Sequence, residues 1–202
     1  MAKVTMVKLS DKTQVTPMGG TAMYVKVNSR IDEYEGKKKY SLNIIFKDKE
    51  KEAAFKKVCD DFLIKAKGLA DFEGKQWRKG NDRCGYTENE DGTLSFRFQT
   101  QAFYTDKETG EEKQRFIPIL NAQTRKKLAN DVLIGNGSEV RVAFTPTAYW
   151  MTKESNGVNL YINKMVVDKL IEYGGNDDFS DFGIEVESEA DESSDMDEDC
   201  PI

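Results

Sequence analysis

The chain has 202 residues, of which 38% are apolar, enough to form one hydrophobic core. It carries a net charge of −6 and contains no histidine, so catalytic sites of the Ser-His-Asp or Cys-His type are excluded. The three cysteines, Cys59, Cys84 and Cys200, are far apart and odd in number, which predicts neither a disulfide framework nor a zinc site. We therefore expect no enzyme, no metal and no cofactor.

The first residues contain no apolar segment of the kind that a signal peptide requires. No stretch approaches the roughly 20 apolar residues that cross a bilayer. We expect a cytoplasmic protein with no membrane partner.

The net charge hides two opposite parts of the chain. The last basic residue is Lys169, and from Gly175 onward there are 12 Asp and Glu residues and no Lys or Arg. Residues 1–174 hold all 30 basic residues and the other 24 of the 36 acidic ones, a net charge of +6. A basic body is therefore followed by an acidic tail.

The first part of the body predicts three strands. Lys3–Leu9 alternates weakly, whereas Thr21–Val27 and Tyr40–Phe46 alternate clearly between apolar and polar residues. The charged segment Glu35–Lys39 predicts a turn, so the last two strands form an antiparallel pair. The side chains expected to point inward are Met23, Val25, Val27, Tyr40, Leu42, Ile44 and Phe46.

The period of the pattern then changes. From Asp48 to about Lys67, apolar residues recur about every four positions, which predicts an amphipathic helix. Asp48 is suited to cap its start and Gly68 to end it. Residues 71–92 have little periodicity and predict a long loop.

The remaining body returns to strand patterns. Thr93–Phe103 predicts a strand, residues 104–114 a charged hairpin loop, and Asn121–Ile134 a short helix capped by Asn121. Glu139–Thr145 and Gly157–Val167 predict two closing strands. The side chains expected to point inward are Leu94, Phe96, Phe98, Val140, Val142, Phe144, Val158, Leu160 and Ile162.

Short strands with one apolar face and one interposed helix predict a mainly β fold. Because closing a sheet removes its edges, we expect a small antiparallel barrel of the OB-fold type. Residues 1–174 would form this domain. Residues 175–202 have too few large apolar side chains to offset the entropy of ordering, so we expect a disordered tail.

The outward faces of the predicted strands carry aromatic, basic and amide side chains. Such a face suits single-stranded nucleic acid, because bases stack on rings and cations follow phosphates. A one-residue shift of phase would instead place these side chains in the core. The candidate contacts on the strands are Tyr24, Lys26, Asn43, Arg97, Gln99 and Tyr161.

Two further segments add candidates. Tyr149 and Trp150 are adjacent, so on a strand one of them is exposed, where it could stack on a ligand or pack at the rim. In residues 74–83, basic residues surround a tryptophan in a glycine-flanked loop, which favours a flexible clamp over a nucleic-acid strand. The alternative is a tryptophan that is pinned to the barrel. The loop candidates are Trp77, Arg78, Lys79 and Arg83.

An acidic tail tethered to a basic groove can compete with nucleic acid for that groove. Effective concentrations on a flexible linker are of order millimolar, so a weak contact would be populated. A released tail could then bind a basic-rimmed apolar pocket on a protein partner. The residues expected to bind this partner are Asp195, Asp197, Glu198, Asp199, Pro201 and Ile202.

Three segments resemble phage-encoded single-stranded DNA-binding proteins. "DMDEDCPI" is similar to the tip of their acidic tails, although Ile202 stands where phenylalanine is common. "KKYSLNIIFKDKEKEAAFKKV" resembles their strand-to-helix segment, and "IGNGSEVRVAFTPTAYW" with "GVNLYINKMVV" resembles their closing strand pair. The resemblance implies an OB-fold that coats transient single strands in phage DNA replication, recombination or repair.

The same resemblance implies that the tail recruits replication proteins such as a polymerase, helicase or primase, within the host bacterial cytoplasm. The sequence leaves the oligomeric state open, a homodimer included.

Two other functions compete with single-stranded DNA binding. An acidic-tailed adaptor or chaperone for a basic protein would not explain the basic body. A Mg²⁺-dependent nuclease would need converging acids, whereas Asp60, Asp61, Glu111 and Glu112 are expected to be solvated.

Overall fold

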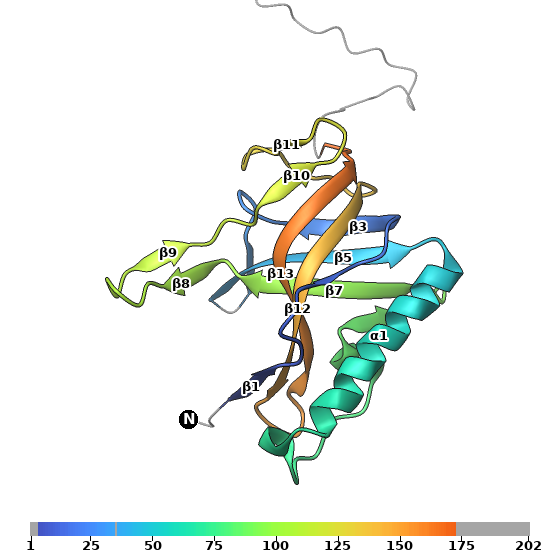
Figure 1. Cartoon of the computed structure of the whole chain (residues 1–202), viewed down its shortest axis with the longest axis vertical. Helices are drawn as coiled ribbons and strands as arrows, with labels where there is room; N and C mark the ends of the chain where they lie inside the picture. Colours follow the sequence, from blue (N-terminus) through green and yellow to red (C-terminus); the bar gives the residue numbers. More distant parts are fainter. Residues whose placement is uncertain (1–3, 35, 173–202) are drawn as a thin grey trace, which may run out of the picture.

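Five strands form a closed barrel in the computed structural model of the chain, which describes residues 4–34 and 36–172 (Figure 1). They lie in the order β12-β3-β5-β7-β13, and β13 pairs back with β12 to close the ring. Only β7 and β13 run parallel, meeting at Phe98 and Leu160, while the other four pairs are antiparallel. The closed barrel agrees with the prediction from the strand pattern. The strands are β3 (Gly20–Lys26), β5 (Lys37–Phe46), β7 (Leu94–Gln101), β12 (Glu139–Trp150) and β13 (Asn156–Lys169).

The alternation of β5, β7, β12 and β13 places their apolar side chains inside the barrel. The inward faces predicted for these four strands are all buried, at 8% exposure or less. The pattern holds because successive side chains of a strand point to opposite faces.

β3 is the strand in which one predicted orientation is wrong. Ala22 is buried there, and Met23, which we expected to point inward, is partly exposed. Tyr24 has a φ of 53°, and the register against β5 shifts between Met23 and Lys26. This bulge changes the phase of the strand, so Val25 is buried while Tyr24 and Lys26 lie on the outer face as predicted.

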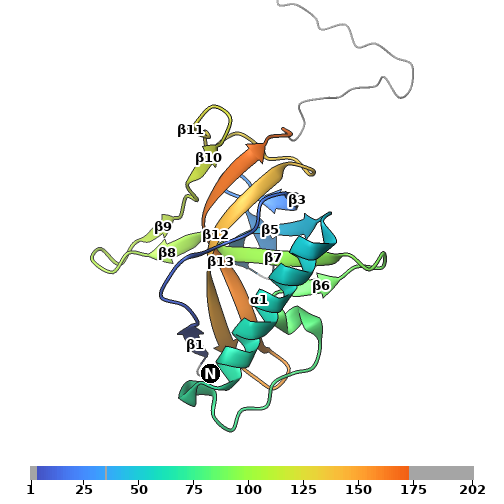
Figure 2. The same cartoon turned by 45° about the vertical axis from the view of Figure 1, so that its right-hand side comes forward.

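Helix α1 (Lys49–Lys67) covers one side of the barrel and completes the core. In both views it lies away from the arm formed by β8 (Phe103–Thr105) and β9 (Glu112–Gln114) (Figures 1 and 2). Its Phe55 ring lies 4.8 Å from that of Phe96 and 5.9 Å from that of Phe144. As predicted, Asp48 caps the helix, accepting hydrogen bonds from the amides of Glu50 and Lys51. The helix ends before Gly68.

The short helix predicted for Asn121–Ile134 is absent from the described structure. Instead β10 (Ile119–Asn121) turns back into β11 (Lys126–Lys127). The Asn121 side chain accepts hydrogen bonds from the amides of Gln123 and Thr124, which is an Asx turn rather than a helix cap. Arg125, with a φ of 56°, continues the turn.

Shorter elements extend the barrel. The charged segment 104–114 forms a hairpin, as predicted, between β8 (Phe103–Thr105) and β9 (Glu112–Gln114). The predicted loop 71–92 contains η1 (Ala70–Phe72), η2 (Asn81–Cys84) and the short strand β6 (Tyr86–Glu88). Within residues 4–34 and 36–172, no helix has the length and apolar content needed to cross a membrane. The remaining strands are β1 (Thr5–Lys8), β2 (Gln14–Val15) and β4 (Asp32–Tyr34).

Candidate nucleic-acid interface

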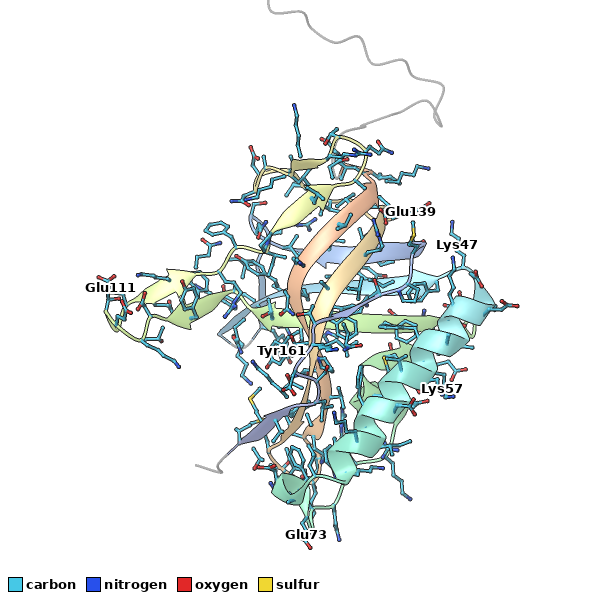
Figure 3. All side chains as sticks on the ribbon, viewed as in Figure 1. Lys47, Lys57, Glu73, Glu111, Glu139 and Tyr161 are labelled. Carbon is cyan, nitrogen blue, oxygen red and sulfur yellow. The ribbon has the colours of Figure 1, made fainter. Side chains whose placement is uncertain are left out.

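Three adjoining hollows form a groove across the outer face of the barrel. Their volumes are about 470, 400 and 510 Å³. The first two share Gln99, Tyr149 and Asn159, and the last two share Gln101 and Tyr161. The groove therefore continues from β3 and β5 across β7 to the pair β12 and β13. Figure 3 labels Tyr161 where β13 crosses the middle of the molecule.

The first hollow is polar and carries charges of both signs. The Lys26 ammonium lies 2.7 Å from the Asp32 carboxylate, which also accepts a hydrogen bond of 3.1 Å from the Ser41 hydroxyl. The hydrogen bond from Lys26 holds the pKa of the Asp32 carboxyl below its ordinary value. Arg97 points out from β7 and is exposed. Because Lys26 is paired with Asp32, Arg97 is the one of these two cations that is freer to bind an anionic ligand.

The second hollow is lined by rings and methionines. Tyr149 and Tyr161 face it, together with the exposed side chains of Met6 and Met151. Burial raises the pKa of the Tyr161 hydroxyl, which is uncharged at neutral pH even at its ordinary pKa. Flat, uncharged surfaces of this kind suit stacking of bases without a sequence preference.

An amide pair lies where the first two hollows meet. The Gln99 side-chain nitrogen donates a hydrogen bond of 2.8 Å to the Asn159 side-chain oxygen. The Lys39 ammonium contacts the Gln99 oxygen at 3.4 Å. Burial, and then the charge of Arg97, lower the pKa of Lys39. The centre of the groove therefore combines hydrogen-bonding groups with clustered positive charge.

The structure brings most of the candidate residues from the sequence to this one surface. They come from all five barrel strands and from the loop after α1. Those that line the groove are Tyr24, Lys26, Asn43, Arg78, Arg97, Gln99, Tyr149 and Tyr161. Phe96 and Phe98, by contrast, are fully buried, in agreement with the prediction that they pack in the core.

Four candidates do not line the three hollows. The Trp77 ring packs edge-on against Phe72, with 5.3 Å between centroids, which fits the alternative of a pinned tryptophan. The Trp150 indole donates a hydrogen bond of 3.0 Å to the Gln76 carbonyl. Arg83 donates to the Arg78 carbonyl. Lys79 is exposed on the same loop. The loop after α1 has no hydrophobic periodicity, so the sequence could not predict where its side chains lie. Their positions depend on how the loop packs against the rest of the protein.

Several groove residues were missed by the sequence reasoning. β1 pairs with the end of β12, Thr5 opposite Trp150, and so brings Met6 to the groove. Its weak alternation carried no sign of this role. Asn159, whose side chain accepts the hydrogen bond from Gln99 in the groove, was not selected either. The other lining residues not selected include Asp32, Tyr34, Lys37, Lys39, Met151, Thr100, Gln101 and Arg115.

The acids considered for a nuclease do not line the groove. Asp60 accepts hydrogen bonds from the Lys56 ammonium at 2.7 Å and from the Tyr86 hydroxyl at 2.8 Å. Glu111 and Glu112 are exposed on the β8–β9 arm. In the part of the chain that the structure describes, no three His, Cys, Asp or Glu side chains gather as a metal site. The tail candidates, from Asp195 to Ile202, lie outside the described residues.

Asn156 holds together the loops at one end of the groove. It is fully buried, and its amide nitrogen donates to the carbonyls of Thr152 and Lys153 at 2.8 and 2.9 Å. Its side-chain oxygen accepts from the Arg78 amide at 3.0 Å, and its carbonyl accepts from Arg78 Nε at 2.7 Å. Asn156 thus sets the position of Arg78 at the groove.

We expect Asn156→Ala to lower the free energy of unfolding by about 1–3 kcal/mol, because it removes the three hydrogen bonds that the buried side chain makes to the backbone. Urea unfolding measures this change. Asn163→Ala is the matched control on the same strand, since Asn163 is exposed, and its effect should stay within about 0.5 kcal/mol. Equal stability of Asn156→Ala and the unchanged protein would contradict the assigned role.

Comparison with known proteins decides the family. The family described as "Single-stranded DNA-binding protein, Bacteriophage T7" matches residues 13–170. The chain belongs to this family. Curated members include the single-stranded DNA-binding proteins of Escherichia phage T7, 31% identical over 103 residues, and of Enterobacteria phage T3, 30% identical over 91 residues. These matches cover 50% and 45% of this chain and 43% and 39% of the relatives, less than half of their length.

Solved structures of such phage proteins share the fold. The crystal structure of gp2.5, a single-stranded DNA binding protein encoded by bacteriophage T7, matches with a TM-score of 0.65 at 21% identity and covers 91% of this chain and 99% of that one. The single-stranded DNA-binding protein of bacteriophage Enc34, truncated at its C-terminus, matches with a TM-score of 0.52 at 14% identity. That match covers 75% of this chain and 83% of the other. The shared fold confirms the predicted OB-fold-like barrel.

Proposed function

We propose that this protein binds single-stranded DNA along the outer groove of the barrel, without a strong sequence preference. The observation that carries the proposal is the groove itself, in which the five barrel strands place tyrosines, cations and amides on one continuous surface. Membership of the T7-type family supports the same function. On this proposal the protein is a binding protein and not an enzyme.

The chemistry of the groove assigns a role to each kind of side chain. Tyr149 and Tyr161 would stack on bases, which is worth roughly 1–3 kcal/mol per base. Arg97 and Arg78 would neutralise phosphates, and the Gln99–Asn159 amides would accept or donate hydrogen bonds at base edges. Every base has a flat face, so stacking favours a sequence-tolerant binder.

The test is a titration of the full chain against labelled oligo(dT) of about 30 nucleotides and against its duplex with oligo(dA). DNA anisotropy is the better readout, because neither tryptophan lines the groove. We expect preference for the single strand, with log K falling against log salt by about 0.7 for each neutralised phosphate. Equal binding to the duplex, or no binding, would contradict the proposal.

We also propose the wider role that the sequence suggested. The protein would protect transient single strands during phage DNA replication, recombination or repair in the host cytoplasm. The acidic segment 175–202 would compete for the groove and recruit a polymerase, helicase or primase. The support is the contrast between 12 acidic residues in that segment and a net charge of +6 in residues 1–174. We also propose that the protein can form a homodimer. Light scattering, which gives the molar mass in solution, tests this.

Deleting residues 175–202 is expected to tighten binding to oligo(dT), because a tethered competitor is removed. The gain should shrink as salt rises, since the competition is electrostatic. Anisotropy titrations at several salt concentrations measure it. A full-length variant with the 12 acids changed to amides separates charge from length and should behave like the deletion. Equal or weaker binding after deletion would rule out the competitor.

A further inference from the structure

Exposed rings gather beyond the groove, at the base of the β8–β9 arm. Tyr104 is 43% exposed and Phe116 is 52% exposed. The Arg115 guanidinium carbon lies 5.4 Å from the centre of the Tyr104 ring. Together with Gln114, these residues line an open hollow of about 530 Å³. Two rings and a guanidinium on one exposed surface are unusual for a solvated turn, because large rings at the surface forgo burial.

This arm-base hollow adjoins the end of the groove. Arg115 also lines the third hollow of the groove, where Gln101 and Tyr161 lie. A strand leaving Tyr161 therefore reaches Arg115 first and the two rings of the hollow next. Figure 3 shows the arm projecting from the barrel on one side of Tyr161.

Hydrogen bonds hold the arm base against the barrel. The Arg115 amide donates to the Ala102 carbonyl at 2.7 Å, and the buried Tyr40 hydroxyl donates to the Arg115 carbonyl at 2.7 Å. The Gln114 side chain donates to the same hydroxyl at 2.9 Å. The backbone that carries these side chains is thus placed before any ligand binds, which lowers the entropic cost of binding.

The charge of the arm limits how far a polyanion can extend. Beyond the base, the arm carries Asp106, Glu108, Glu111 and Glu112 against Lys107 and Lys113, a net charge of −2, and Lys113 is paired with Asp106 at 2.6 Å. Figure 3 labels Glu111 at the outer end of the arm. A phosphate chain is therefore attracted to Arg115 at the base and repelled by the tip.

We infer that the base of the arm is a terminal stacking subsite, at which a base of the DNA strand lies on Tyr104 or Phe116 and Arg115 contacts the adjoining phosphate. The inference rests on the proposed function, since it lengthens the same binding path. The groove holds the middle of the strand, and the arm base holds the end that leaves across β13.

The test compares oligo(dT) of increasing length, from about 4 to about 16 nucleotides, in titrations of the full chain. In the unchanged protein the affinity should rise until the strand reaches the arm base. In the double variant Tyr104→Ala/Phe116→Ala the rise should stop earlier, with affinity for the longest strand lower by about 5- to 150-fold, as for one lost base stack. The shortest strands should bind both proteins equally.

Two conservative variants separate stacking from other effects. Tyr104→Phe keeps the ring and should bind all lengths as the unchanged protein does. Phe116→Leu keeps an apolar side chain without the ring and should lose affinity only for long strands. Thermal unfolding checks that each variant is folded, as expected for changes at exposed positions.

The outcomes distinguish this inference from the proposed function. If the unchanged protein binds single strands and the double variant matches it at every length, the arm-base subsite is overturned and the groove stands. If the double variant loses only self-association, the rings form an interface between copies, and the subsite is again overturned. If the unchanged protein binds no single strand of any length, both proposals fail.

Discussion

The double variant Tyr149→Ala/Tyr161→Ala is expected to lose most of the affinity for single-stranded DNA. Both rings line the second hollow of the groove, and Tyr149 also lines the first hollow. Each lost stack costs roughly 1–3 kcal/mol, so the pair should weaken binding by at least about 2 kcal/mol. Anisotropy titration with oligo(dT) measures the loss.

The controls separate stacking from folding. Tyr149→Phe/Tyr161→Phe keeps both rings and should retain nearly all the affinity. The alanine variant should unfold at nearly the same urea concentration as the unchanged protein, because both side chains are only partly buried. Lys57→Ala, an exposed cation on α1, is a further control for general electrostatic effects. Unchanged affinity in the folded alanine variant would refute the assignment of the groove.

Phe98→Ala is expected to have the largest effect on stability, lowering the free energy of unfolding by about 3–5 kcal/mol. The ring is fully buried and lies 5.3 Å from Phe144, edge to face. It also stacks at 6.3 Å on Phe55, so one change loosens both the barrel and the contact with α1. Urea unfolding followed by circular dichroism measures the loss.

The exposed Phe116 provides the matched control for this change. Phe116→Ala removes the same ring from a position that is 52% exposed, and the stability should change by less than about 1 kcal/mol. Phe98→Leu should cost less than Phe98→Ala, since it leaves a smaller cavity. Similar losses for Phe98→Ala and Phe116→Ala would contradict the central place given to the barrel core.

Local periodicity determined the faces of most strands. In β5, Tyr40, Leu42 and Ile44 alternate with Ser41 and Asn43, and the structure buries the first set completely. The period of two is a property of the backbone of any strand, so it can be read without knowing the partner strand. The helix α1 was predictable for the same reason, since its spacing near four and its Asp48 cap are local signals.

Local signals were ambiguous where one residue can serve two backbone conformations. Asn121 can cap a helix or close an Asx turn, because in both cases its side chain accepts hydrogen bonds from amides two and three residues on. At Tyr24 the bulge depends on pairing with β5, and the Tyr24 amide donates to the Asn136 side chain at 2.7 Å. Because Asn136 is 112 positions away in the chain, the hydrophobic pattern around Tyr24 does not indicate this contact.

By itself the sequence determined the faces of β5, β7, β12 and β13, the helix, the basic body and the outward tyrosines and cations of this member of the T7-type family. The tertiary structure alone decided which of those side chains meet. It joined Tyr149, Tyr161 and Arg97 in one groove, added Met6 from β1, and turned Trp77 onto Phe72. The reason is physical: side-chain direction is set by neighbouring residues, whereas adjacency in a closed barrel is set by the pairing of strands far apart in the chain.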